Sequence, residues 1–330
     1  MVNIFRYAGF GVESNFGTAV DATFHIDQAS VTLDTPSAPE IMVPSGMGRA
    51  PRVKVPGFYY PSGNIDYAFD IETVGWFLRW ALPGGYVYTG ASKLHELYGT
   101  DTLTPQSFTT RVGKDVFEHT FAGCVMNSLA LSVDNGLTNA SLGIMAQKDS
   151  KATIKSGIGD LTLPSDAPMT FADVSVEVNS EDYNAVCKSF TLNINNNTNA
   201  DTGRTVGSRF PSSYQFAGRD VTCNLSLLFP DTEMMTLFWG DASTIQNCGS
   251  TELPIEITIA QNCPTNSRAL TILLPNTVME QARQQPRGRD NLLQEISVRA
   301  MVGNDVVLND ASTVDTDILC SLVNGTGTMA

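Results

Sequence analysis

The sequence carries the same order of strand, tryptophan-containing helix and further strands twice, about 155 residues apart. Gly63–Phe69 aligns with Arg219–Leu225 at an offset of 156 residues, and Val125-Met126 aligns with Val278-Met279 at an offset of 153. Solenoid repeats are about 20–50 residues long, so a period this large predicts a duplicated domain. We expect a first domain with an N-terminal arm over residues 1–160 and a second domain with a C-terminal tail over residues 161–330.

Apolar periodicity predicts mostly strands in both copies, with one helix in each. Ile65, Tyr67 and Phe69 alternate along one strand, whereas apolar residues recur at helical spacing over residues 72–82 and 230–239. Helices this apolar are expected to pack on a sheet. The residues expected to make that contact are Val74, Phe77, Leu78, Leu237 and Phe238. The predicted fold class is therefore mainly β, with β-sandwich or barrel-forming sheets and one flanking α-helix per domain.

Turn residues divide the rest of the chain into short strands. A loop is expected between the first helix and residue 106, hairpin turns at residues 113–114 and 134–136, and a polar connector, which could hold a short strand, at residues 148–170. Further strands are expected at residues 24–33, 52–55, 106–112, 116–121, 125–133, 139–147, 187–194, 220–228, 255–260, 269–274, 277–281 and 292–301.

The charge of the chain argues against nucleic-acid binding. Its formal net charge is −14, divided as −5 over residues 1–170 and −9 over residues 171–330. Tight binding of DNA or RNA needs clustered positive charge. An acidic surface is compatible with letting DNA pass without adhering, although acidity of this kind also simply keeps a protein soluble.

Six cysteines are widely spaced, and none forms a CxxC pair. This spacing argues against zinc fingers and against a disulfide framework, so a reducing compartment is expected. We expect neither a signal peptide nor a membrane-spanning segment.

The residue patterns of common active sites do not occur. The three histidines, His25, His95 and His119, have no HExxH context, and the sequence contains neither a GxSxG elbow nor a P-loop. The sequence therefore predicts no catalytic residue, no metal site, no cofactor and no enzymatic activity.

Two groups of residues are candidates for contacts between subunits. The aromatic run Phe58, Tyr59 and Tyr60 lies between prolines, and it could form an extended arm that docks on a neighbour or pack on its own sheet. The basic group Arg283, Arg287 and Arg289 could pair with acidic residues of a neighbour or remain solvated. Phe10 and Phe16 are further candidates; they lie in the glycine-punctuated segment at residues 9–20, which is expected to be irregular.

Several short motifs, taken in order, resemble the tail tube proteins of long-tailed bacteriophages. The resemblance spans residues 9–303, and no single motif is decisive. The motifs are Gly9-x-Gly11-x-Glu13-x-x-x-Gly17-Thr18-Ala19, the Gly63–Pro83 strand and helix, Phe121-Ala-Gly-Cys124-x-x-Asn127-Ser-Leu-x-Leu131-Ser132-Val133, Cys187-Lys-Ser-Phe-Thr-Leu-x-Ile194 and Gly288-Arg289-Asp290-x-Leu292-x-Gln294-Glu295.

This resemblance implies a structural virion protein whose rings stack into a hollow tail tube for genome delivery. Six domains usually surround the lumen in such tubes. Two domains per chain would then give a trimeric, pseudo-hexameric ring that contacts other tail proteins, is assembled in the host cytoplasm, and lets DNA pass without specific binding. The role of residues 311–330 does not follow from the resemblance.

Two other classes of structural or binding protein stay open at this point. One is a different ring of the virion, such as a head–tail connector or a baseplate component. The other is a carbohydrate-binding β-sandwich, which would be a stable monomer.

Overall fold

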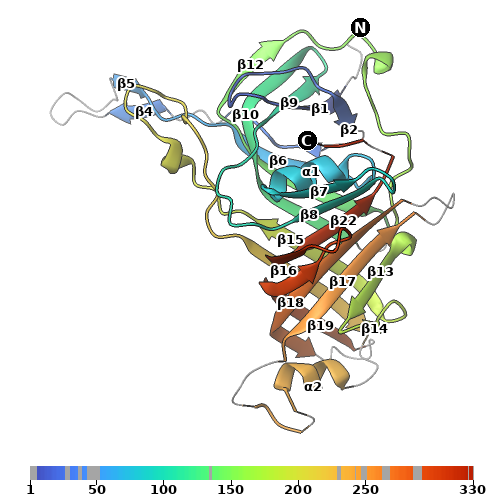
Figure 1. Cartoon of the computed structure of the whole chain (residues 1–330). Coiled ribbons are helices and arrows are strands. Elements are labelled where there is room, and N and C mark those ends of the chain that lie inside the picture. The colour runs from blue at the N-terminus through green and yellow to red at the C-terminus, as the bar shows by residue number, and fades with distance from the viewer. Residues whose placement is uncertain are drawn as a thin grey trace.

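A computed structural model describes residues 6–26, 30–35, 39–42, 53–133, 136–228, 232–241, 243–246, 251–261, 268–284, 292–325 and 327–329. Over these residues the protein is mainly β, with large antiparallel sheets and two α-helices, as the sequence predicted. The first half of the chain lies at one end of the molecule and the second half at the other, with α2 at the far tip (Figure 1). The hairpin of β4 and β5 projects from one side.

The first half builds two sheets that share one strand. One sheet has the order β2–β1–β9–β10–β12, and the other has the order β3–β6–β11–β10. The elements are β1 (Arg6–Val12), β2 (Phe24–Ile26), β3 (Ser30–Val31), β4 (Pro39–Met42), β5 (Val53–Pro56), β6 (Ser62–Ala68), α1 (Val74–Ala81), β7 (Gly85–Thr89), β8 (Leu94–Tyr98), β9 (Phe108–Lys114), β10 (Phe117–Val133), β11 (Thr138–Met145) and β12 (Lys148–Ala152).

The second half repeats this arrangement around another long strand, β18. One sheet contains β14–β13–β17–β18–β22, and the other contains β15–β16–β19–β18. The elements are β13 (Val174–Val178), β14 (Glu181–Asp182), β15 (Cys187–Asn195), β16 (Asp220–Leu228), α2 (Glu233–Trp239), β17 (Leu253–Ala260), β18 (Ala269–Gln284), β19 (Leu293–Met301), β20 (Gly303–Val307), β21 (Thr313–Thr316) and β22 (Leu319–Val323).

Strand β10 passes from one sheet to the other because its backbone is interrupted twice. Gly123 has a positive φ of 65°, which L side chains rarely adopt. A β-bulge between Met126 and Ser128 then shifts the register against β11. The two strands predicted at residues 116–121 and 125–133 are therefore one bent strand. The strands predicted at residues 269–274 and 277–281 also form one strand, β18, with a bulge between Met279 and Gln281.

The two halves share sheets and a core. Strand β10 pairs with β15, so β3–β6–β11–β10–β15–β16–β19–β18 run as one sheet of eight strands. Strand β22, close to the C-terminus, pairs with β8 of the first half on one side and with β18 on the other. Buried apolar residues of both halves form one cluster. The boundary near residue 160 remains a prediction.

Helix α1 covers the core side of these sheets. The Asp70 carboxylate accepts hydrogen bonds from the backbone N–H of Thr73, at 2.8 Å, and from its hydroxyl, at 2.5 Å, at the start of the helix. Val74, Phe77 and Leu78 are fully buried, and the helix contacts β10 and β8. In α2, Leu237 and Phe238 are half-buried against the core, and Gly240 ends the helix in the left-handed region.

Three local predictions were wrong. The loop expected before residue 106 contains a hairpin, β7–β8, whose alternating tyrosines pack against neighbouring side chains. The turn expected at residues 113–114 lies instead at Asp115 and Val116, because Asp115 adopts a positive φ of 57° and Lys114 pairs with Phe117. The segment at residues 9–20, expected to be irregular, begins within β1, which pairs with β9. The short strand considered in the connector is β12, which pairs with β10. None of the described helices is long and apolar enough to span a membrane.

Candidate functional site

The eight-strand sheet has one apolar face and one polar face. Strand alternation places core residues such as Leu131, Leu192 and Leu225 on one side. The other side carries mostly polar residues, many of them small and few of them charged, in rows that run across both halves. One row is Ala68, Asn139, Ser132, Thr191, Asn224, Ser297 and Gln281, and the next is Asp66, Ser141, Ala130, Asn193, Thr222, Arg299 and Val278.

Charges on this polar face are few and partly paired. The Arg299 guanidinium lies 2.7 Å from the Asp220 carboxylate and 2.6 Å from that of Glu280. These three side chains are about half exposed, so the pairs add little to stability. Asp66, which accepts a hydrogen bond from Ser141, adds one further negative charge, and Glu295 faces Arg283 across the strands. The face is therefore smooth, polar and weakly acidic.

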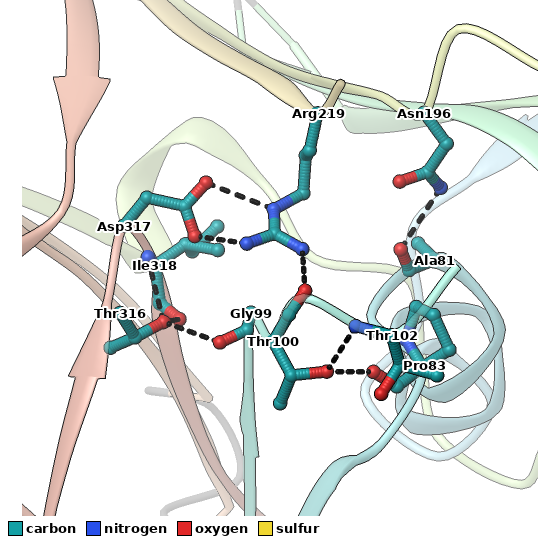
Figure 2. A network of polar contacts seen from close by, with 10 residues as sticks. All are labelled: Ala81, Pro83, Gly99, Thr100, Thr102, Asn196, Arg219, Thr316, Asp317 and Ile318. Carbon is teal, nitrogen blue, oxygen red and sulfur yellow. Dashed lines mark hydrogen bonds and ion pairs between the residues drawn. The ribbon is translucent and has the colours of Figure 1, made fainter. Parts of the chain in front are cut away.

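A largely buried ion pair of the second half lies beside this sheet and hydrogen-bonds to the first half (Figure 2). The Arg219 guanidinium donates to both carboxylate oxygens of Asp317, at 2.9 and 2.6 Å, and to the Thr100 carbonyl oxygen at 3.0 Å. Arg219 precedes β16, Asp317 precedes β22, and Thr100 follows β8. A Cβ at Gly99 would lie 2.2 Å from the guanidinium, so only glycine leaves room for it.

Asn196 makes a second connection between the halves (Figure 2). Its side-chain amide donates to the carbonyl oxygens of Ala81, at the end of α1, and of Met126, next to the β10 bulge. The amide is buried, which makes the loss of these bonds costly.

The C-terminal segment, whose role the sequence left open, is part of the fold. Besides β22, the Asn324 amide donates to the Ile71 carbonyl oxygen at 3.2 Å. Met329 is fully buried, and its backbone N–H donates to the Tyr86 hydroxyl. This segment therefore binds α1 and β7 to the second half.

The aromatic run packs on its own chain. Phe58 and Tyr60 contact a small cluster around Tyr214, and Arg204 lies over the Phe58 ring at 4.6 Å. The Tyr59 ring makes an edge contact with Phe210. These contacts lie next to the projecting β4–β5 hairpin, on which Ile41 is exposed.

Asp149 on β12 anchors this aromatic run. Its carboxylate accepts hydrogen bonds from the hydroxyls of Tyr59, at 2.5 Å, and of Thr35, and it contacts His119 at 2.7 Å. Burial raises the pKa of Asp149, but the donors Thr35, Tyr59 and His119 together outweigh burial and hold the pKa below its usual range. The carboxylate therefore stays charged and keeps the arm in place.

The other predicted contact residues lie in different places. Phe10 is fully buried against Phe77 and Trp80, so it belongs to the core and offers no surface to a neighbour. Phe16 is half-buried against Tyr214, and Arg283 is exposed at the end of β18. Arg287 and Arg289 lie outside the described residues.

Sequence reasoning did not find Arg219, Asp317, Asn196 or Asp149. Each makes its contacts with residues far away in the chain, so no local pattern marks it. The described part of the chain contains no group of three or more His, Cys, Asp or Glu residues that could hold a metal ion.

His25 makes the stability of the first half depend on pH. The imidazole is buried, and its Nδ1 accepts a hydrogen bond from the Thr162 backbone N–H at 3.0 Å. The pKa of His25 is lowered below its usual value of 6.5, chiefly by burial and secondly by the positive charge of nearby Lys155. The unfolded chain therefore takes up a proton first, and stability is expected to fall as the pH drops below about 6.5.

Replacing His25 with glutamine should reduce this pH dependence, because glutamine can still accept the Thr162 bond and does not titrate. Denaturant unfolding at pH 7.5, 6.0 and 5.0 measures the free energy of unfolding of the unassembled wild type and variant. Below pH 6.5 the free energy of unfolding of the wild type should fall by up to about 1.4 kcal/mol more per pH unit than that of the variant. Equal losses in both proteins would contradict the assignment.

No curated protein matches the chain. A family model described as phage tail tube protein matches residues 7–300, which is most of the sequence. Proteins of this family are structural components of the virion tail, where they assemble with themselves and with other tail proteins. The chain belongs to the phage tail tube protein family.

Proposed function

We propose that three copies of this chain form a pseudo-hexameric ring, with residues 1–160 and 161–330 as its two tube domains. The observation that carries the proposal is the single sheet across both halves, to which each half contributes four strands. A head-to-tail contact between identical chains closes into a ring when the rotation per chain fits. Stacked rings of this kind make the hollow tail tube.

In this ring the polar face of the eight-strand sheet lines the lumen. Three such sheets make a barrel of about 24 strands, about 50 Å across between backbones, for strands about 4.8 Å apart and tilted by about 40°. That width leaves room for duplex DNA. A wall of small residues with few, mostly acidic charges gives phosphate groups nothing to bind.

The same proposal makes the chain a passive conduit rather than an enzyme, assembled in the host cytoplasm. The cysteines Cys124, Cys187, Cys223 and Cys320 carry free thiols, which fits a reducing compartment. The projecting β4–β5 hairpin would contact an adjacent ring.

Mass measurement and electron microscopy of the purified, assembled protein test the ring. The expected particle has three times the chain mass of 35.5 kDa per ring and stacks into tubes of uniform bore. A monomer at high concentration would contradict the ring. Rings that never stack would favour a connector or baseplate component instead.

Positive charge on the polar face should make the tube retain DNA. Asn193→Lys with Asn224→Lys adds six charges to the wall of a trimeric ring, and both residues are exposed. Tubes of this variant are expected to bind duplex DNA with an affinity that falls steeply as salt rises, while wild-type tubes bind little. Co-sedimentation of short duplexes with tubes measures the binding.

A charge-matched control places the same lysines elsewhere. Ala91→Lys with Ser92→Lys lies in the exposed turn between β7 and β8, away from the eight-strand sheet. DNA retention by the control equal to that of the Asn193/Asn224 variant would show that the polar face does not line the path of DNA.

A further inference from the structure

The eight-strand sheet has two open edges among the described residues, and the internal repeat relates them. The second half of β10 pairs with β11 on one side and β15 on the other. The corresponding part of β18, residues 278–284, pairs with β19 on one side, and its other edge has no strand partner among the described residues. Strand β3 pairs with β6 on one side, and its other edge is likewise open in the described structure.

The bulges fix how the two long strands correspond. The bulge of β10 follows Val125-Met126, and the bulge of β18 follows Val278-Met279. Ser128 therefore corresponds to Gln281. Following the paired residues across each sheet from these two positions reaches Asn64 and Thr32 in the first half, and Asn224 and Thr191 in the second.

The correspondence extends along the sequence of the edge strand. Ser30-Val-Thr-Leu-Asp34 aligns with Ser189-Phe-Thr-Leu-Asn193, so β3 is the counterpart of β15. Asp34 continues the line of β3, because it forms a bridge with Ser62. Within the chain, β10 pairs with β15. The open edge of β18 is the counterpart of the β10 edge in that pair, and the open edge of β3 is the counterpart of the β15 edge.

Carrying the register of β10 and β15 onto the open edges gives specific neighbours. Within the chain, Ala130 lies opposite Asn193. The counterpart of Ala130 is Arg283, and the counterpart of Asn193 is Asp34. The register thus places a guanidinium of one copy opposite a carboxylate of the next, where the chain itself has an uncharged pair.

The charges around both positions suit this pairing. The Asp34 side chain is 70 % exposed, and its contact with Lys114 is long, at 3.5 Å. Arg283 is exposed and faces Glu295 across β18 and β19. Opposite charges directly across a strand pair favour one register over its neighbours.

We propose that the open edge of β18 pairs antiparallel with β3 of a second copy of this chain, in the register that sets Arg283 opposite Asp34. The pairing rests on the proposed ring. It adds a defined register between neighbouring copies and an ion pair that favours this register over others. In a trimeric ring, three copies of this contact and three internal β10–β15 contacts then alternate around the lumen.

A double-cysteine variant of the full chain tests the register. Directly opposite residues have Cβ atoms about 5 Å apart, within reach of a short thiol-to-thiol linker. Arg283→Cys with Asp34→Cys, treated with the linker after assembly, should lose its 35.5 kDa monomer band in denaturing electrophoresis and gain covalent dimers and trimers. Each single substitution alone should keep the monomer band, which controls for the native cysteines.

A matched variant uses the same strands and the same face in a wrong register. Gln281→Cys with Thr32→Cys is offset by four residues from the proposed pairing, about 13 Å along a strand, and should stay monomeric in the same gel. If rings form but the 281–32 pair links and the 283–34 pair does not, the register is overturned while the ring survives. If the wild type forms no ring, both proposals fail.

Charge reversal gives a second readout that needs no cysteine. Arg283→Glu should slow assembly of rings, and adding Asp34→Lys should restore the wild-type rate. Circular dichroism of the unassembled variants checks their folding. Failure of the second substitution to restore assembly in a folded chain would overturn the ion pair.

Discussion

Replacing Arg219 with alanine is expected to lower the free energy of unfolding by about 3–5 kcal/mol, because it leaves Asp317 charged and without its partner in a nearly closed site. The two side chains are only 15 % and 11 % exposed. Besides Asp317, the guanidinium also satisfies the Thr100 carbonyl oxygen. Denaturant unfolding of the unassembled chain measures the change.

Two further variants make this prediction specific. Arg6→Ala removes an ion pair with Asp115 whose arginine is 71 % exposed, and it should cost less than about 1 kcal/mol. The double variant Arg219→Met with Asp317→Leu removes both charges and should recover much of the stability lost in Arg219→Ala. A loss below 1 kcal/mol for Arg219→Ala would mean that the ion pair and the hydrogen bond from Arg219 to Thr100 contribute little to stability.

The second large effect is expected at Trp80, which fills the space between α1 and the sheets of the first half. Its ring is fully buried and stacks on Phe108, with centroids 4.1 Å apart. Phe24 and Phe77 also contact it. Trp80→Ala should lower the free energy of unfolding by about 3–5 kcal/mol, because the neighbouring aromatic rings cannot close the cavity.

Trp76 provides the matched control, because it lies one helical turn earlier in α1 and is only half-buried. Trp76→Ala should cost clearly less than Trp80→Ala. Trp80→Phe should retain most of the stability, because it keeps an aromatic ring in the stack. Thermal or denaturant unfolding measures the stability of each variant. Equal losses of stability in the two alanine variants would show that the aromatic stack around Trp80 is not a main source of stability in the core.

Both predictions concern how the two halves become one rigid unit. Trp80 holds α1 against the sheets of the first half, while β22, which pairs with β8, and the hydrogen bond from Arg219 to Thr100 join that half to the second. A tube wall needs such rigidity, because an angle that varied between the halves would prevent regular ring closure.

Sequence reasoning predicted the elements well wherever their pattern was periodic. The alternation in β6 and β16 and the helical spacing in α1 arise because each element buries one face. Burial of one face gives a periodic pattern that can be read from neighbouring residues in the sequence. The hairpin β7–β8 escaped prediction and β12 was only considered as a short strand of the connector, because their residues are polar or aromatic without a clean period. Their pairing with β22 and β10 stabilises them instead.

The mainly β class, the helix in each half, the repeat and the family resemblance follow from the amino-acid sequence alone, since these depend on local periodicity and on short ordered motifs. The folded structure was needed to establish which strands pair across the halves, that the C-terminal segment completes the sheet beside β8, and that Phe10 lies in the core. Pairing partners are chosen by edges and registers that lie far apart in the chain, and hydrogen bonding between backbones leaves little trace in residue type. For the same reason the open edges of β3 and β18, on which the proposed pairing of Arg283 with Asp34 rests, belong to the fold and are not marked in the sequence.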